Sequence, residues 1–162
     1  MPLSDLVDLV NEWGTRPREK NGRPPAEGQL TTLADEIHAV FAEGSGRAGR
    51  LTALLRQSGV RPEMAEESGS LDATWAVDDP DQRLRAAAAL ALRHHLAEHP
   101  GRLGVCADTQ CADVYVDASP AGRRRFCCLT CQNRARAAAF RRRHRTADPS
   151  RAQAGDELAK GS

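Results

Sequence analysis

Apolar residues recur at helical spacing through the first hundred residues, and this pattern predicts a mostly α-helical domain. The longest expected helix is rich in alanine, the residue with the highest helix propensity, and Pro100-Gly101 ends it. Trp13 and Trp75 are expected in the core. The expected helices run from a cap at Ser4 to Trp13, from a cap at Thr31 or Thr32 to Gly44, from Arg50 to Gln57, and from Asp81 to Glu98.

The segments between these helices carry the residues that interrupt regular structure. Gly14 to Gly28 is rich in glycine, proline and charge and is expected to be a loop. Met64 to Ser70 is polar and is also expected to be a loop, whereas Leu71 to Val77 fits either a short strand or a turn of helix. Thr146 to Ser162 has little apolar content, which predicts a disordered tail.

After Pro100 the pattern changes from helical spacing to alternation. Asp113 to Asp117 alternates like a strand, Ser119 to Gly122 has the composition of a turn, and Arg123 to Phe126 could return as the second strand. A basic helix is then expected from Cys131 to Arg145, with Thr130 as its N-cap. On this helix Ala137 and Phe140 form a face that could pack on the preceding module.

All five cysteines lie in this region, with the outer spacing C-x4-C-x15-C-x3-C. Two local pairs joined by a hairpin are the usual way to supply four thiolates to a structural zinc ion. Cys106 and Cys111 form the first pair. The spacing leaves open whether Cys127 or Cys128 joins Cys131 in the second. A disulfide and a reactive Cys128 thiol among arginines are competing interpretations.

A cysteine knuckle, a hairpin and a helix in this order predict a treble-clef-like zinc finger. The fold class is therefore mostly α, with a helical domain over 1–100, the finger and its basic helix over 101–146, and the tail over 147–162. Four thiolates would close the coordination shell of the metal. No nucleotide-binding or hydrolase motif is found either, so no enzymatic activity is expected.

Charge is divided unevenly along the chain. Residues 1–100 carry 11 basic and 16 acidic residues, a net charge of −5, whereas residues 101–162 carry 12 and 6, a net charge of +6. From Ala121 to Arg145 there are nine arginines and no acid, which indicates a polyanionic partner such as DNA. In the alternative interpretation the arginines neutralise the zinc-thiolate cluster. The predicted DNA contacts are Arg123, Arg124, Arg125, Arg136, Arg141, Arg142, Arg143 and Arg145.

The stretch Phe126-Cys127-Cys128-Leu129-Thr130-Cys131-Gln132-Asn133-Arg134 resembles the signature of the CGNR zinc finger, with Gln132 in place of glycine. The resemblance implies that Cys127 is the ligand, which completes the set Cys106, Cys111, Cys127 and Cys131 on Zn²⁺. Asn133 and Arg134 are expected to tie the start of the helix to the finger. Residues 1–100 are similar to the ABATE domain, and this implies a stress-induced transcription regulator.

These patterns together predict a zinc-dependent DNA-binding regulator that is cytoplasmic, because the chain has no apolar run that could span a bilayer and no signal peptide. A homodimer through the acidic domain and a small-molecule effector bound there are further expectations. Asn11 is expected to hydrogen-bond within the fold or to line the effector pocket. The alternatives are an adaptor for an acidic protein and a redox sensor that acts through Cys128.

Overall fold

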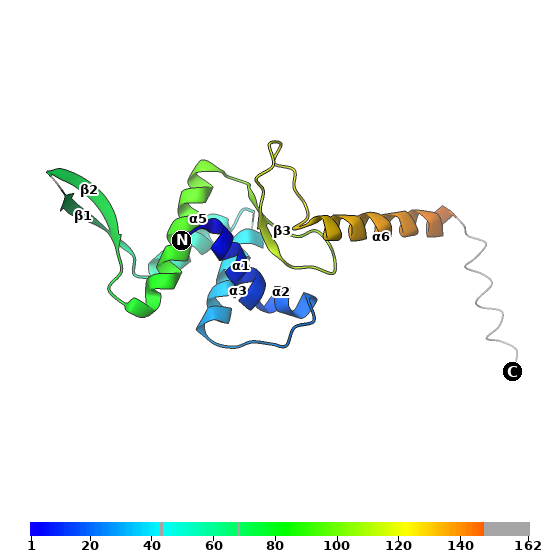
Figure 1. The fold of residues 1–162 in the computed structure, drawn as a ribbon, viewed down its shortest axis with the longest axis horizontal. Coiled ribbons are helices and arrows are strands. Elements are labelled where there is room, and N and C mark those ends of the chain that lie inside the picture. Colours follow the sequence, from blue (N-terminus) through cyan, green and yellow to red (C-terminus); the bar gives the residue numbers. More distant parts are fainter. Residues whose placement is uncertain (43, 68, 148–162) are drawn as a thin grey trace, which may run out of the picture. The chain divides into compact units, whose positions relative to one another are not determined.

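The computed structural model describes residues 1–42, 44–67 and 69–147, and helices account for 55% of the described residues, as the sequence predicts. The chain divides into two compact units, residues 1–127 and 128–162. The elements of the first unit are α1 (Leu3–Trp13), α2 (Thr15–Lys20), α3 (Gln29–Ala42), α4 (Arg47–Gln57), β1 (Arg61–Glu67), β2 (Ser70–Ala76), the 3-10 helix η1 (Pro80–Gln82), α5 (Arg83–Glu98), β3 (Leu103–Val105) and β4 (Val114–Val116) (Figure 1).

The core of the first unit lies among α1, α3, α4 and α5. It is built from aliphatic side chains and one aromatic ring, as the low aromatic content requires. The strands β3 and β4 contribute Leu103 and Val114 to the same core, so this unit continues past residue 100, where the sequence suggested a domain boundary. The main core residues are Leu6, Val10, Leu33, Ile37, Val40, Phe41, Leu54, Ala88, Ala89 and Leu92.

Two antiparallel hairpins complete the unit. In the first, β1 pairs with β2 in a register that sets Arg61 opposite Ala76 and Met64 opposite Ala73. In the second, β3 pairs with β4, and this short hairpin packs on α1 and α3. Figure 1 shows β1 and β2 extending away from the helices of this unit.

The second unit consists, as far as it is described, of α6 (Leu129–Ala147). Its sequence combines alanines with arginines, and both residue types favour the helix. The helix begins at Leu129, so the expectation that Thr130 caps it is wrong, and Thr130 lies in the first turn. The predicted disordered tail falls largely on residues 148–162, which lie outside the described part of the chain.

Several local predictions for the helical region are corrected. α1 begins at Leu3 with Pro2 at the cap position, so Ser4 is not the N-cap, and its hydroxyl bonds the Asp5 carboxylate instead. The segment expected as a loop over 14–28 contains α2, which Pro17 can enter because proline is tolerated in a first turn. The helix expected to start with a cap at Thr31 or Thr32 is α3, and it begins at Gln29, before both expected caps.

The strands were predicted less well than the helices. Of the expected loop Met64–Ser70, residues 64–67 belong to β1 and Ser70 begins β2, and the ambiguous stretch Leu71–Val77 lies in β2 as far as Ala76. The return strand expected over Arg123–Phe126 is absent from the described structure, because β4 pairs with the upstream strand β3. The turn of this hairpin therefore contains the first cysteine pair.

Both tryptophans lie at the surface, so the prediction that they are core residues is wrong. Trp13 is 37% exposed and Trp75 is 47% exposed. Each ring has a guanidinium over it: Arg18 lies 5.9 Å from the Trp13 ring centroid, and Arg93 lies 5.3 Å from that of Trp75. Cation–π contacts of this kind let a large ring remain at the surface. None of the described helices is both long and apolar enough to cross a membrane.

Candidate metal centre

Four of the five cysteines come together in space. The sulfur atoms of Cys106, Cys111, Cys127 and Cys131 all lie within 4.8 Å of one another, and no disulfide joins any of the cysteines, all of which are described. The remaining cysteine, Cys128, is exposed and lies outside this group. The arrangement thus favours Cys127 over Cys128 as the third donor, which spacing alone had left open.

The donor set fits zinc. Tetrahedral zinc with Zn–S bonds of about 2.3 Å requires sulfur atoms roughly 3.8 Å apart. The Cys111 and Cys127 sulfur atoms are 3.7 Å apart. The four thiolates would hold Zn²⁺ as a closed structural site, and the ion would supply the cross-link that the surrounding loops otherwise lack.

The first cysteine pair sits in a tight turn between β3 and β4. The Asp108 side chain accepts a hydrogen bond from the Gln110 backbone N–H at 3.1 Å, and the Cys111 N–H donates to the Asp108 carbonyl at 3.0 Å. The Cys106 N–H donates to the Asp113 carbonyl at 2.9 Å. These bonds turn both thiols of the pair toward the same point.

Backbone N–H groups also point at the sulfur atoms. The Asp113 N–H donates to Cys111 Sγ at 3.4 Å, and the Cys127 N–H donates to Cys106 Sγ at 3.5 Å. Burial raises the pKa of the Cys111 thiol to about 12. Burial also acts to raise the pKa of Cys106, but the hydrogen bonds from the Cys127 and Asp108 backbone outweigh it and the net shift is downward. Such N–H donors stabilise thiolates, the form that binds metal.

Side chains from the helical domain hold this turn in place. The Asn11 amide pairs with the backbone of Val114: its Nδ2 donates to the carbonyl at 3.2 Å, and its Oδ1 accepts from the N–H at 2.8 Å. The prediction that Asn11 hydrogen-bonds within the fold is thus confirmed. Because a carbonyl oxygen can only accept, the buried His38 ring donates from Nε2 to Ala112 O at 2.9 Å. Asn21 adds a bond to the Asp113 carboxylate at 3.2 Å.

The loop that leads to the second cysteine pair is ordered by two residues, Asp117 and Arg124. The buried Asp117 carboxylate accepts from the backbone N–H groups of Ser119 and Arg124 at 2.8 and 2.9 Å. A side-chain hydrogen bond with Ser119 contributes most to lowering the pKa of Asp117, and the two backbone bonds add to it. The Arg124 guanidinium bonds the carbonyls of Val116, Phe126 and Cys127.

Tyr115 connects the hairpin to this loop. Its hydroxyl donates to the Arg124 carbonyl at 2.6 Å, and the Arg124 guanidinium lies 5.0 Å from its ring centroid. The ring lies across Gly104 on the paired strand, where an added Cβ would meet ring atoms at 2.7 Å. A glycine at this position therefore lets Tyr115 reach the loop.

Within the second unit, Cys131 lies in the first turn of α6, where free N–H groups and the helix dipole stabilise a thiolate. The Arg134 guanidinium donates to Cys131 Sγ at 3.4 Å, in keeping with its predicted structural role. Asn133 is exposed, and its role in tying the helix to the finger stays a prediction.

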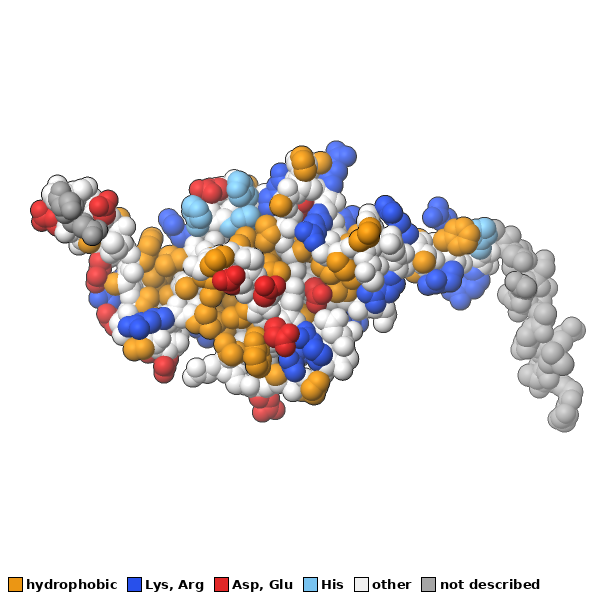
Figure 2. Space-filling model, viewed as in Figure 1, with side chains coloured by type: hydrophobic (Ala, Val, Ile, Leu, Met, Phe, Trp, Pro, Cys, Tyr) orange, Lys and Arg blue, Asp and Glu red, His pale blue; other side chains and the backbone are white. Residues whose placement is uncertain are grey.

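The rest of α6 is strongly basic. It carries six arginines and no acid, and Figure 2 shows blue side chains on both sides of it. Within this unit the Phe140 ring lies against its helical neighbour His144, with ring centroids 4.1 Å apart, and the expectation that it packs on the finger stays a prediction. The predicted DNA contacts on α6 are exposed, namely Arg136, Arg141, Arg142, Arg143 and Arg145.

The three arginines before the second cysteine pair differ from one another. Arg124 is engaged with backbone carbonyls, as described above, so its guanidinium serves the loop. The Arg125 guanidinium lies 5.9 Å from the Phe126 ring centroid. The backbone carbonyl of Arg125 accepts a hydrogen bond from the Ala107 N–H. Arg123 and Arg125 are exposed, as is part of Arg124.

Sequence reasoning did not find His38, Asn21, Asp117 or Tyr115 as residues that support the site. A buried histidine on the apolar stripe of a helix gives no sign of its partner, which lies 74 positions along the chain. Asp117 could have been found, because an aspartate two residues before a serine at a turn is typical of a side-chain-to-backbone bond.

Comparison with known proteins supports the metal centre. Residues 102–144 match the model of the CGNR zinc finger, and the matched segment contains all four clustered cysteines and most of α6. No curated protein matches the chain. The likeness of residues 1–100 to an ABATE domain stays a prediction. The chain thus carries a segment similar to the CGNR zinc finger, with four cysteines placed as a zinc site requires.

Proposed function

We propose that the protein is a zinc-dependent DNA-binding regulator of transcription, in which the finger and α6 contact DNA. The observation that carries this proposal is the chemistry of α6, a 19-residue helix with six arginines, no acid and, among the described residues of its unit, no buried apolar face. Zinc would anchor the first turn of this helix through Cys131. The proposal includes no enzymatic activity and places the protein in the cytoplasm.

The dimensions of α6 suit a duplex. At about 1.5 Å per residue its length is about 28 Å, and the major groove of DNA is about 12 Å wide and admits an α-helix. Arg134, Arg141 and Arg145 follow one side of the helix at i, i+7 and i+11, while Arg136 and Arg143 lie roughly opposite. Arginines on both sides of a helix in a groove can reach the phosphates of both strands or a guanine edge.

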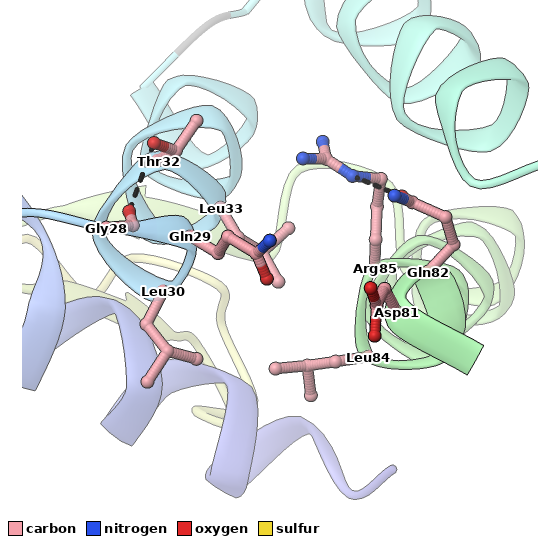
Figure 3. A pocket seen from close by; sticks show the side chains of 9 residues that line it. All are labelled: Gly28, Gln29, Leu30, Thr32, Leu33, Asp81, Gln82, Leu84 and Arg85. Atoms are coloured by element: carbon pink, nitrogen blue, oxygen red, sulfur yellow. Dashed lines mark hydrogen bonds between the residues drawn. The ribbon is translucent and has the colours of Figure 1, made fainter. Parts of the chain in front are cut away.

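The helical domain offers a place for the expected small-molecule effector. A hollow of about 480 Å³ lies between the start of α3 and the start of α5 (Figure 3). Leu30 and Leu33 of α3 line one wall. Leu84 of α5 stands on the other, together with Gln82 and Arg85, which are joined by a hydrogen bond of 3.1 Å. We include an effector in the proposal on the basis of this mixed lining.

The test is fluorescence anisotropy of a labelled duplex titrated with the zinc-loaded full chain over a range of salt concentrations. If five α6 arginines contact phosphate, the slope of log K against log salt is about −4.5. Replacing Arg141 and Arg145 with glutamine should make the slope shallower by about 2. The matched control replaces Arg56 and Arg83, which are exposed on the helical domain, and should leave the slope unchanged.

The same titration separates the proposal from its rivals. Absence of binding at low salt would overturn DNA binding and favour an adaptor for an acidic protein. A redox sensor is supported by the exposure of Cys128 beside the cysteine cluster. That function requires oxidant-triggered zinc release to stop in Cys128→Ser, whereas the DNA-binding proposal requires Cys128→Ser to bind DNA like the wild type.

A further inference from the structure

One face of the β1–β2 hairpin is apolar and uncovered. Residues paired across an antiparallel ladder point to the same side, so the pairs Pro62–Trp75, Met64–Ala73 and Glu66–Leu71 share one face. Met64 is 66% exposed and Leu71 is 69% exposed. The opposite face carries Arg61, Glu63, Asp72 and Thr74 and is polar.

This face is unlike an ordinary exposed surface. A two-stranded hairpin is at best marginally stable in water and normally packs an apolar face on a helix or a further strand. Arg93 of α5 reaches this face from the helices, and its guanidinium lies over the Trp75 ring. A row of large exposed apolar side chains on a regular strand pair marks an interaction surface.

The charges on this face lie at its two ends. Glu66 lies near the turn, beside Leu71, and Arg93 lies at the base, beside Trp75. The Met64–Ala73 pair lies midway between the Pro62 and Glu66 pairs. A face with an acid at one end, a base at the other and apolar residues between them is complementary to itself when one copy is turned by a half rotation.

We propose that this face binds the same face of a second copy of the chain about a two-fold axis. The axis passes near Met64, and Leu71 packs on the partner's Trp75. Glu66 then faces the partner's Arg93, and the arrangement is repeated on the other side of the axis, as an isologous interface requires. The proposal names the surface for the expected homodimer and does not depend on DNA binding.

Charge selects this occupant over a polyanion or an acidic protein. The hairpin carries more acids than bases, which would repel both, whereas in the two-fold arrangement its polar face points away from the partner copy. If the two hairpins ran in the same direction, the two Glu66 carboxylates would meet. In the proposed arrangement the hairpins run in opposite directions, and each Glu66 faces an arginine. The contact is small, because seven residues per strand extend only about 23 Å, so we expect a dimer that dissociates on dilution.

The test is sedimentation velocity of the zinc-loaded full chain over a concentration series without DNA. The wild type should pass from 17.5 kDa toward twice that mass as concentration rises. Glu66→Arg and Arg93→Glu should each weaken association at least tenfold, since each substitution places like charges together at two points. The double variant Glu66→Arg/Arg93→Glu should restore association to within about threefold of the wild type.

The matched control is Asp72→Arg, which makes the same charge change on the opposite face of the same hairpin and should leave association unchanged. Circular dichroism and zinc content check that each variant is folded. A monomer at every concentration, a dimer indifferent to both single substitutions, or a double variant no better than the singles would each overturn the proposal. None of these readings involves DNA, so failure here is distinct from failure of the DNA-binding proposal.

Discussion

The two hairpins of the first unit differ in a way that their lengths do not suggest. β1 and β2 are seven residues each and are exposed along nearly their whole length, whereas β3 and β4 are three residues each and partly form the core. The long hairpin is held mainly by its own ladder. The short one is held by Asn11, His38 and the cysteine cluster.

The difference shows what fixes a β-hairpin in a small helical protein. A short ladder contributes few hydrogen bonds, so it persists only where burial and side-chain partners support it. The contacts with Asn11 and His38 also fix the position of the hairpin, so the turn between β3 and β4 holds its two cysteines in one geometry. The longer ladder makes more backbone hydrogen bonds of its own and extends outward, which suits it for contact with another molecule.

The largest expected effect is that of removing the metal, which should loosen the short hairpin and leave the long one unchanged. In Cys106→Ser one of four thiolates is lost, and zinc content should fall from one ion per chain to near zero. Hydrogen exchange should accelerate strongly at residues 103–116 while remaining unchanged at residues 61–76. Cys128→Ser is the control and should keep its zinc. Equal acceleration in both hairpins would contradict the comparison.

A smaller effect is expected from Asn11→Ala. The substitution leaves the N–H and the carbonyl of the buried Val114 without their Asn11 partners, at a cost of about 2 kcal/mol in the free energy of unfolding. Urea unfolding measures it. Asn21→Ala removes one exposed bond to the same turn and should cost well under half as much. If the two variants were equally stable, the short hairpin would not depend on Asn11.

The free energy of unfolding should also depend on pH, through His95 of α5. Burial is the main cause that lowers the pKa of His95, and the neighbouring His99 adds to it. Because the pKa is lower in the folded state than in the unfolded state, stability is complete above about pH 6.5 and declines as the pH falls through the folded pKa. Relative to His95→Phe, the wild type should therefore lose stability as the pH falls from about 6.5 toward 5. A constant difference over this range would show that burial does not hold the ring neutral.

The smallest effect is expected from removing the long hairpin. Replacing Arg61–Ala76 by two glycines connects Val60 to Val77. These two residues flank the first pair of the ladder, Arg61 and Ala76, so a short link can join them. Since few apolar side chains are buried by this hairpin, the free energy of unfolding should change by less than about 1 kcal/mol. Zinc content should be unchanged. Loss of the helical fold would show that β1–β2 supports the core after all.

Helices and cysteines were predictable because their signals are local. The apolar stripe from Leu33 to Phe41 and the alanine run before Leu92 each repeat at helical spacing, and both segments are helical. The four clustered cysteines are those that the family signature implied. Helix starts were less predictable, because α1 begins beside Pro2 without a side-chain cap.

Strand pairing and support contacts depend on partners far along the chain, and a single sequence does not encode them locally. β4 was expected to pair with Arg123–Phe126, but it pairs with β3, which begins at Leu103. Arg124 instead donates hydrogen bonds from its guanidinium to backbone carbonyls. Trp75 was expected in the core because large aromatic residues are usually buried. It lies instead on a face of the long hairpin, where it is 47% exposed beside Arg93.

The surface position of both tryptophans has a consequence for spectroscopy. Trp13 and Trp75 are each partly exposed beside a guanidinium in the folded chain, so their emission should already resemble that of an indole in water. Unfolding will then change the fluorescence maximum little, and far-ultraviolet circular dichroism is the better probe of the core. Trp75 emission should shift to the blue only when a second molecule covers the hairpin, which makes this residue a built-in reporter of association.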